Sequence, residues 1–260
     1  MVKQSALFEP ISHDSVADAV VHQIETMIVN GILKEGARLP SEREMAERLE
    51  VSRPKLREAL KQLEDEGLLI VRHGEGSFIA QLTGTAMPPA FLDLYARHPA
   101  AFYDYLEYRR EQEAFAARLA AQRATQTDKD IIASILDRMV KAHEDQDLEA
   151  SKVADISFHS AVADASNNST LIHMMASIYD LTRRGVFYNR NFLRTIDTAG
   201  DRLLEQHKAI AEAIFASDPI AAEAAARAHI DFVETSFRLG HDRDQRERMA
   251  EKRKLLWDKG

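Results

Sequence analysis

Residues 39–79 read LPSEREMAERLEVSRPKLREALKQLEDEGLLIVRHGEGSFI and decide the fold of the first part of the chain. Ser41 with Glu44 three residues later is a capping box, which marks the start of a helix. A two-residue turn then leads to Ser52, a second N-cap residue. Pro54 is tolerated in the first turn of that second helix because its missing N–H needs no partner there. The stretch therefore predicts two helices joined by a tight turn.

The residues after the second helix predict a β-hairpin. Gly67 ends the helix, and two short apolar runs, 68–71 and 77–79, flank the glycine-containing turn RHGEG. A preceding amphipathic helix is predicted over 15–30, where apolar residues recur at spacings of three and four. Helix, tight turn, helix and hairpin form a winged helix-turn-helix, which places its second helix in the major groove of DNA.

Short polar and basic side chains begin the second helix, as a recognition helix requires. A run of charges alone reads as a solvated helix face, but the caps, the short turn and the hairpin together favour DNA binding. Arg53 and Arg57 are four residues apart, so they share one helix face and suit phosphate or guanine contacts. The candidate DNA-binding residues are Arg43, Ser52, Arg53, Lys55, Arg57, His73 and Gly74.

The composition of the 260-residue chain excludes several classes of protein. It has no cysteine, which excludes disulfides, thiolate metal sites and cysteine nucleophiles. A net charge of −8 argues against coating nucleic acid through bulk charge, although a local basic surface is compatible with it. The N-terminus lacks a secretory signal pattern, and no apolar run approaches the roughly 18 residues of a membrane span. We expect a cytoplasmic protein without a membrane partner.

Glycine and proline become sparse in the second part of the chain, which predicts long helices joined by short turns. The fold class is therefore mainly α: an N-terminal winged helix-turn-helix domain followed by an all-α helical-bundle effector domain. We assign residues 1–80 to the first, 81–97 to a linker and short helix, 98–240 to the second, and 241–260 to a charged helical tail. The expected helices of the bundle cover about 100–124, 127–146 (capped by Thr127 with Asp130), 148–166, 170–189, 198–216 and 219–239.

Four side chains in the helical part are candidate metal ligands. Asp155 and His159 are four residues apart on one helix, so both point the same way. His207 and His229 lie eleven residues before and after Asp218; a helical hairpin closed there would hold both at the same height. One carboxylate and three imidazoles suit a divalent metal with open coordination positions. Zinc is the expected metal, and nickel, manganese and iron(II) also suit the set.

Two motifs in the first part resemble the DNA-binding domain of the GntR family of transcription regulators. They are GARLPSERE at residues 36–44 and VSRPKLREAL at 51–60. The resemblance implies that operator DNA is contacted by Arg43, Arg53 and Arg57, assisted by the wing at His73 and Gly74.

The second part resembles the effector-binding FCD domain of the FadR subfamily. The pattern runs over residues 107–229, and in metal-binding members of that subfamily a divalent ion is held at the positions of Asp155, His159, His207 and His229. The stretch LDLYARHPAAFYDYL at 92–106 further resembles regulators of pyruvate dehydrogenase, lactate and glycolate operons, which respond to small 2-oxo or 2-hydroxy acids.

Two effector-binding residues follow from this resemblance, Arg109 and Asn168. The resemblance matches Arg109 to a pocket position, where its guanidinium would bind the effector carboxylate. The spacing by itself equally allows an ion pair between Arg109 and Glu113, four residues on. The sequence leaves both roles open for Arg109.

The leading hypothesis is a regulator, expected to be a repressor, that binds palindromic double-stranded operator DNA as a homodimer and responds to a small carboxylate. A metal-dependent hydrolase or lyase with an incidental winged helix is the alternative from another class, although the chain has no Glu-x-x-His pair of the di-iron type. A third hypothesis is a constitutive DNA-binding protein in which the metal only stabilises the fold.

Overall fold

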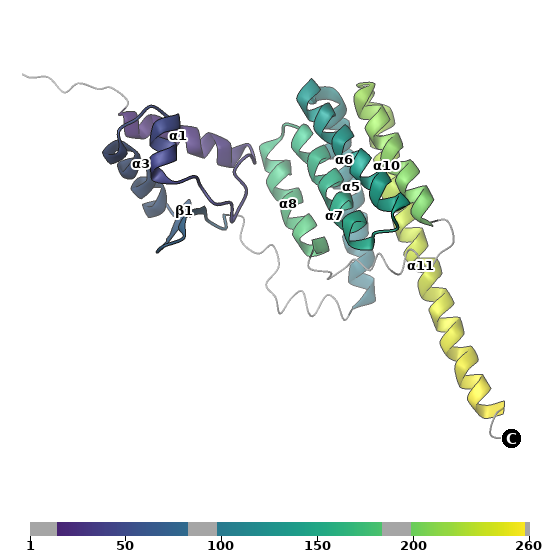
Figure 1. Ribbon diagram of the computed structural model, residues 1–260. Helices are drawn as coiled ribbons and strands as arrows, with labels where there is room; N and C mark the ends of the chain where they lie inside the picture. The colour runs from purple at the N-terminus through teal and green to yellow at the C-terminus, as the bar shows by residue number, and fades with distance from the viewer. Residues whose placement is uncertain (1–14, 83–97, 184–198, 258–260) are drawn as a thin grey trace, which may run out of the picture. The chain divides into compact units, whose positions relative to one another are not determined.

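The computed structural model describes residues 15–82, 98–183 and 199–257 (Figure 1). The chain divides into two compact units, residues 1–84 and residues 85–260. The short helix predicted within 81–97 lies outside the described residues.

The first unit is a winged helix-turn-helix. Both α1 and α2 pack against α3, and the antiparallel strands β1 and β2 form the wing, with Leu69 paired to Ile79. Leu56 and Leu63 of α3 are fully buried in the core between these elements. The bounds are α1 Val16–Val29, α2 Glu42–Arg48, α3 Arg53–Asp65, β1 Leu69–Arg72 and β2 Gly76–Ile79.

The turn between α2 and α3 sets the direction of the recognition helix. Glu50 adopts a positive φ of 54°, and the N–H of Val51 returns to the carbonyl of Ala46 at 3.1 Å, which closes the turn. Ser41 caps α2, accepting the N–H of Glu44 at 3.3 Å, but the Glu44 side chain pairs with Arg48 and does not complete the predicted capping box. Ser52 is the N-cap residue of α3, as predicted, although its side chain makes no capping hydrogen bond.

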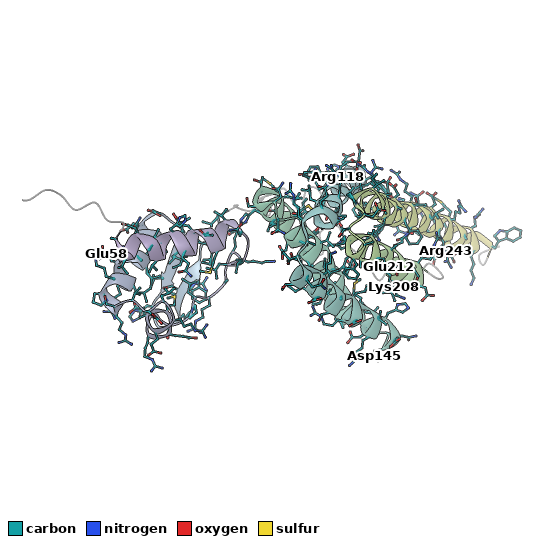
Figure 2. All side chains as sticks on the ribbon, turned by 90° about the horizontal axis from the view of Figure 1, so that it is seen from above. Glu58, Arg118, Asp145, Lys208, Glu212 and Arg243 are labelled. Carbon is teal, nitrogen blue, oxygen red and sulfur yellow. The ribbon has the colours of Figure 1, made fainter. Side chains whose placement is uncertain are left out.

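The second unit is a bundle of helices that lie side by side in Figure 1. The last helix continues past the ends of its neighbours and includes the charged tail, where Figure 2 labels Arg243. Its 39 residues span about 58 Å at the usual helical rise. The bounds are α5 Pro99–Arg123, α6 Gln126–Glu144, α7 Leu148–Ala165, α8 Ser169–Arg183, α10 Ala199–Phe215 and α11 Pro219–Trp257.

Helix α5 lies at the centre of this bundle, against α7, α8, α10 and α11. Its buried face is rich in alanine, and small side chains let neighbouring helices approach closely. Charged and polar side chains are nevertheless buried in the same core: Arg109, Glu113, Asp155, His159, His207 and His229. Within the described ranges, no helix combines the length and the apolar character that crossing a membrane requires.

Helix α6 begins earlier than predicted. The Thr-x-x-Asp pattern occurs twice in succession, and the structure uses Thr125 with Asp128 rather than Thr127 with Asp130. The hydroxyl oxygen of Thr125 accepts the N–H of Asp128 at 3.2 Å, and the Asp128 carboxylate accepts the N–H of Thr125 at 2.8 Å. Asp130 instead accepts a hydrogen bond from the side chain of Gln126. The prediction of Thr127 as the cap is therefore wrong.

This capping box gives a test of the fold. Thr125→Ala removes a side-chain cap and is expected to lower the free energy of unfolding by about 1 kcal/mol. Thr127→Ala is the control, since Thr127 is exposed within the first turn and alanine favours helix. Urea unfolding followed by circular dichroism measures both variants. Equal stability of Thr125→Ala and the wild type would contradict the capping assignment.

Candidate functional site

Three histidines from three helices meet in the core of the bundle: His159 on α7, His207 on α10 and His229 on α11. One nitrogen of each lies within 4.8 Å of the other two. The rings of His207 and His229 are 4.4 Å apart between centroids, so the two residues flanking Asp218 do face each other. All three side chains are at most 2% exposed.

Hydrogen bonds to the outer nitrogens orient these rings. Nδ1 of His207 lies 2.6 Å from the carbonyl oxygen of Leu203, and Nδ1 of His229 lies 3.2 Å from Oε1 of Gln206. Nδ1 of His159 is 2.5 Å from the carboxylate of Glu113. Carbonyl and carboxylate oxygens only accept, so each Nδ1 donates in these contacts, and Nε2 is the ring nitrogen left to face a metal.

The inner nitrogens point toward one another in an arrangement that suits a cation. Nε2 of His207 is 3.3 Å from Nε2 of His159 and 3.3 Å from Oδ1 of Asp155. Burial, reinforced by the neighbouring His207 and His159, lowers the pKa of His229 well below its ordinary value, so this imidazole is neutral. Lone pairs of neutral imidazoles next to a carboxylate are the donors that zinc and related divalent metals take. The three histidines therefore fit a divalent metal ion, and Asp155, the fourth predicted ligand, lies beside His207.

Arg109 and Glu113 form a buried ion pair beside the histidines. Nε of Arg109 donates to Oε1 of Glu113 at 2.7 Å, and the two side chains are 3% and 6% exposed. Burial would raise the pKa of Glu113, but the neighbouring His159 and Arg109, which both donate hydrogen bonds to its carboxylate, outweigh burial and lower that pKa to about 2. Arg109 also lies close enough to lower the pKa of His229. The Arg109–Glu113 ion pair that the spacing predicts is therefore formed, and it places the Arg109 guanidinium next to the candidate metal ligands.

The structure gives Asn168 a capping role. Its Oδ1 accepts the N–H of Leu171 at 3.1 Å, at the start of α8. Its own N–H donates to the hydroxyl of Ser166 at 3.3 Å. Asn168 follows His159 by nine residues, beyond the end of α7. These contacts account for the residue through local structure, and its effector-binding role stays a prediction.

The candidate DNA-binding residues lie on the first unit as the sequence places them. Arg43 is the second residue of α2, Arg53 is the first residue of α3, and both side chains are exposed. Within the described residues neither forms an ion pair. Lys55 pairs with Glu58 at 2.8 Å, and Figure 2 labels this glutamate. Arg57 donates to Glu42 of α2 at 2.7 Å.

The wing carries His73 and Gly74 at its exposed turn, where Gly74 has a φ of +78°. The guanidinium of Arg72 stacks over the ring of Phe78 at 4.6 Å. Arg38, which the sequence did not single out, is exposed and lies beside the wing. Residue 38 forms a β-bridge to Phe78, and a β-carbon built on Gly76 would lie 3.5 Å from its Nε. No local pattern points to Arg38, because its bridge to Phe78 joins residues forty positions apart.

Two further residues around the histidines were not predicted as part of the site: Glu113 and Gln206. The spacing showed Glu113 only as a partner of Arg109, while its bond to His159 joins residues on different helices. Gln206 precedes a candidate ligand in the sequence but contacts the ligand on the next helix. Both orient imidazoles rather than point at the space between them.

Family models match both units. The model of the bacterial regulatory proteins of the gntR family matches residues 16–79, and the FCD domain model matches residues 104–232.

Curated relatives cover most of the chain. The putative L-lactate dehydrogenase operon regulatory protein of Escherichia coli K12 is 36% identical over 234 residues, which cover 88% of this chain and 89% of that protein. The Glc operon transcriptional activator of the same organism is 33% identical, covering 83% and 86%. The HTH-type transcriptional regulator LutR of Bacillus subtilis is 35% identical, covering 80% and 94%.

A solved structure, Streptococcus agalactiae GntR, is similar over 86% of this chain and 99% of that one, with 27% identity and a TM-score of 0.51. The relatives are regulators of transcription rather than enzymes. The chain therefore belongs to the GntR family of DNA-binding transcription regulators, in the FadR subfamily that carries an FCD domain.

Proposed function

We propose that this regulator senses a small carboxylate at a divalent metal site in its FCD domain. Asp155, His159, His207 and His229 would hold the metal, with zinc as the expected ion. The observation that carries the proposal is the convergence of three buried imidazole nitrogens next to a buried arginine. A bound divalent ion would supply positive charge and open coordination positions for a carboxylate oxygen.

Arg109 would bind the carboxylate of the effector. Its guanidinium is a planar fork that suits a carboxylate, and its bond to Glu113 engages only Nε. The effector class that fits is a small 2-oxo or 2-hydroxy acid, because such an acid offers a carboxylate and a neighbouring oxygen. Relatives named for the lactate dehydrogenase and Glc operons support this class.

On DNA, we propose that two copies bind a palindromic operator as a homodimer. The two α3 helices would enter the major groove at half-sites about one DNA turn apart. Exposed Arg43 and Arg53 support this role, since neither pairs with an acidic side chain of the described ranges and both are available to phosphates and bases. We further propose that the protein is a repressor, so the acid is expected to weaken operator binding. If the acid instead tightened operator binding, the protein would act as an activator, which is what one relative is named.

A thermal-shift screen tests the effector class. Zinc-loaded protein is expected to unfold at a higher temperature with pyruvate, lactate or glycolate, because a ligand that binds only the native state stabilises it, by about 2.7 kcal/mol at one hundred times its Kd. Acetate is the control, because it has the carboxylate without the neighbouring oxygen. Equal shifts with all four acids, or none with any, would contradict a 2-oxo or 2-hydroxy acid effector.

The rival within the family is a constitutive DNA-binding protein with a structural metal. That protein would bind its operator with the same affinity whether or not an acid is present. Removing zinc with a chelator would then lower the unfolding temperature without creating or abolishing any effector response.

A further inference from the structure

Glu113 contacts both the candidate effector-binding residue, Arg109, and a candidate metal ligand, His159. One carboxylate oxygen, Oε1, accepts the Nε–H of Arg109 at 2.7 Å, and the other, Oε2, accepts Nδ1–H of His159 at 2.5 Å. The exposed fractions of the side chains of Arg109, Glu113 and His159 are 3%, 6% and 2%. A carboxylate this deep in a helical core is destabilising unless both of its oxygens are engaged. Here one oxygen is engaged by the candidate effector-binding arginine and the other by a candidate metal ligand.

Building on the proposed function, we infer that Glu113 is a positioning residue that prepares His159 for the metal and Arg109 for the effector. Through Oε2 it accepts the Nδ1–H of His159, which leaves Nε2, 3.3 Å from Nε2 of His207, as the nitrogen available to the metal. Through Oε1 it fixes the guanidinium by Nε. One carboxylate thereby couples the affinities for the metal and for the acid, and such coupling acts equally in both directions.

The other two imidazoles are oriented by neutral groups. The carbonyl of Leu203 holds His207, and the side-chain oxygen of Gln206 holds His229. A carboxylate makes the stronger, charge-assisted hydrogen bond and raises the basicity of the imidazole it holds. Among these three supports, Glu113 is therefore expected to have the largest effect on metal affinity.

Zinc affinity tests this role without any effector or DNA. In the full chain, Glu113→Gln is expected to bind Zn²⁺ about 10- to 100-fold more weakly in competition with a chelating dye. Glu107→Gln is the matched control, the same substitution at an exposed position of α5, and is expected to bind Zn²⁺ like the wild type. Equal Zn²⁺ affinity of Glu113→Gln and the wild type would overturn the inference.

A second variant covers the case in which Glu113→Gln does not fold. The substitution leaves the charge of Arg109 buried without its counter-charge, which is strongly destabilising. The double variant Arg109→Met with Glu113→Gln removes both charges together. It is expected to fold and still to lose at least about tenfold in Zn²⁺ affinity. Wild-type affinity in the double variant would contradict the positioning role.

The tautomer of His159 separates this inference from the metal proposal. Nitrogen-15 NMR of the metal-free protein is expected to show the proton on Nδ1, with the signal assigned by its loss in His159→Gln. In Glu113→Ala the ring is expected to lose that preference, and an unchanged tautomer would overturn the inference. If the wild type bound no Zn²⁺, the proposed metal site would fail, while the tautomer result would still decide the role of Glu113.

Discussion

Replacing His207 with alanine is expected to abolish metal binding and the response to the acid while leaving operator binding intact. His207 is fully buried, and its Nε2 lies 3.3 Å both from His159 and from Asp155. Loss of a ligand at this central position is expected to weaken zinc binding by more than the roughly 10- to 100-fold that loss of a supporting residue causes. The recognition helix belongs to the other compact unit, so its own contacts to DNA remain.

Elemental analysis of the purified variant measures its metal content, and gel shift measures its operator binding. His143→Ala is the matched control, because His143 lies in the same unit but pairs with Asp201 at 2.8 Å, away from the three histidines. The control is expected to retain zinc. A His207→Ala protein that is folded and holds as much zinc as the wild type would contradict the ligand assignment.

Replacing Arg53 with alanine is expected to weaken operator binding by about 1–3 kcal/mol, or roughly 5- to 150-fold. Arg53 is the first residue of α3, its side chain is exposed, and within the described residues it makes no ion pair. A guanidinium at the start of a recognition helix reaches base edges or phosphates. Fluorescence anisotropy at fixed salt measures the change, since operator affinity depends steeply on salt.

The matched control for this prediction is Arg48→Ala. Arg48 ends α2 and pairs with Glu44 on the surface at 2.8 Å, so its loss is expected to change operator binding little. The salt dependence separates two kinds of contact: loss of a phosphate contact reduces the salt slope by about 1, whereas loss of a base contact relaxes specificity. Wild-type affinity of Arg53→Ala would exclude Arg53 from the interface.

The fold of the first unit could be predicted from sequence because its signals are local. Ser41 with Glu44 and the short turn before Ser52 lie within a few residues of the structure they determine. The start of α6 shows the limit of this approach, because two overlapping Thr-x-x-Asp patterns have equal local merit. The local pattern therefore does not distinguish Thr125 from Thr127 as the cap.

The candidate metal site was partly predictable for a similar reason. One turn of helix brings Asp155 next to His159, and a symmetric hairpin brings His207 opposite His229. The meeting of these two pairs depends on how α7, α10 and α11 are arranged around α5, which no local spacing determines. The bond from Glu113 to His159 has the same origin, because it crosses from α5 to α7.

The net charge of −8 is a sum over the whole chain and does not reveal the basic residues of α3, part of which are paired with acidic side chains. Lys55 and Arg57 of the recognition helix are each paired with a glutamate in the structure. Arg43 and Arg53 stand exposed beside them. An acidic chain with a few available arginines is expected to bind non-specific DNA weakly and to depend on its operator contacts.

Operator affinity with and without the acid, measured on zinc-loaded wild type and on His207→Ala, tests the central proposal most directly. The acid is the one that gives the largest thermal shift, and the salt concentration is held constant. The operator Kd of the wild type is expected to rise about 5- to 150-fold with the acid, the usual range of allosteric coupling, while that of His207→Ala does not change. An equal response of the two proteins, or no response of the zinc-loaded wild type, would contradict control of DNA binding through this metal site.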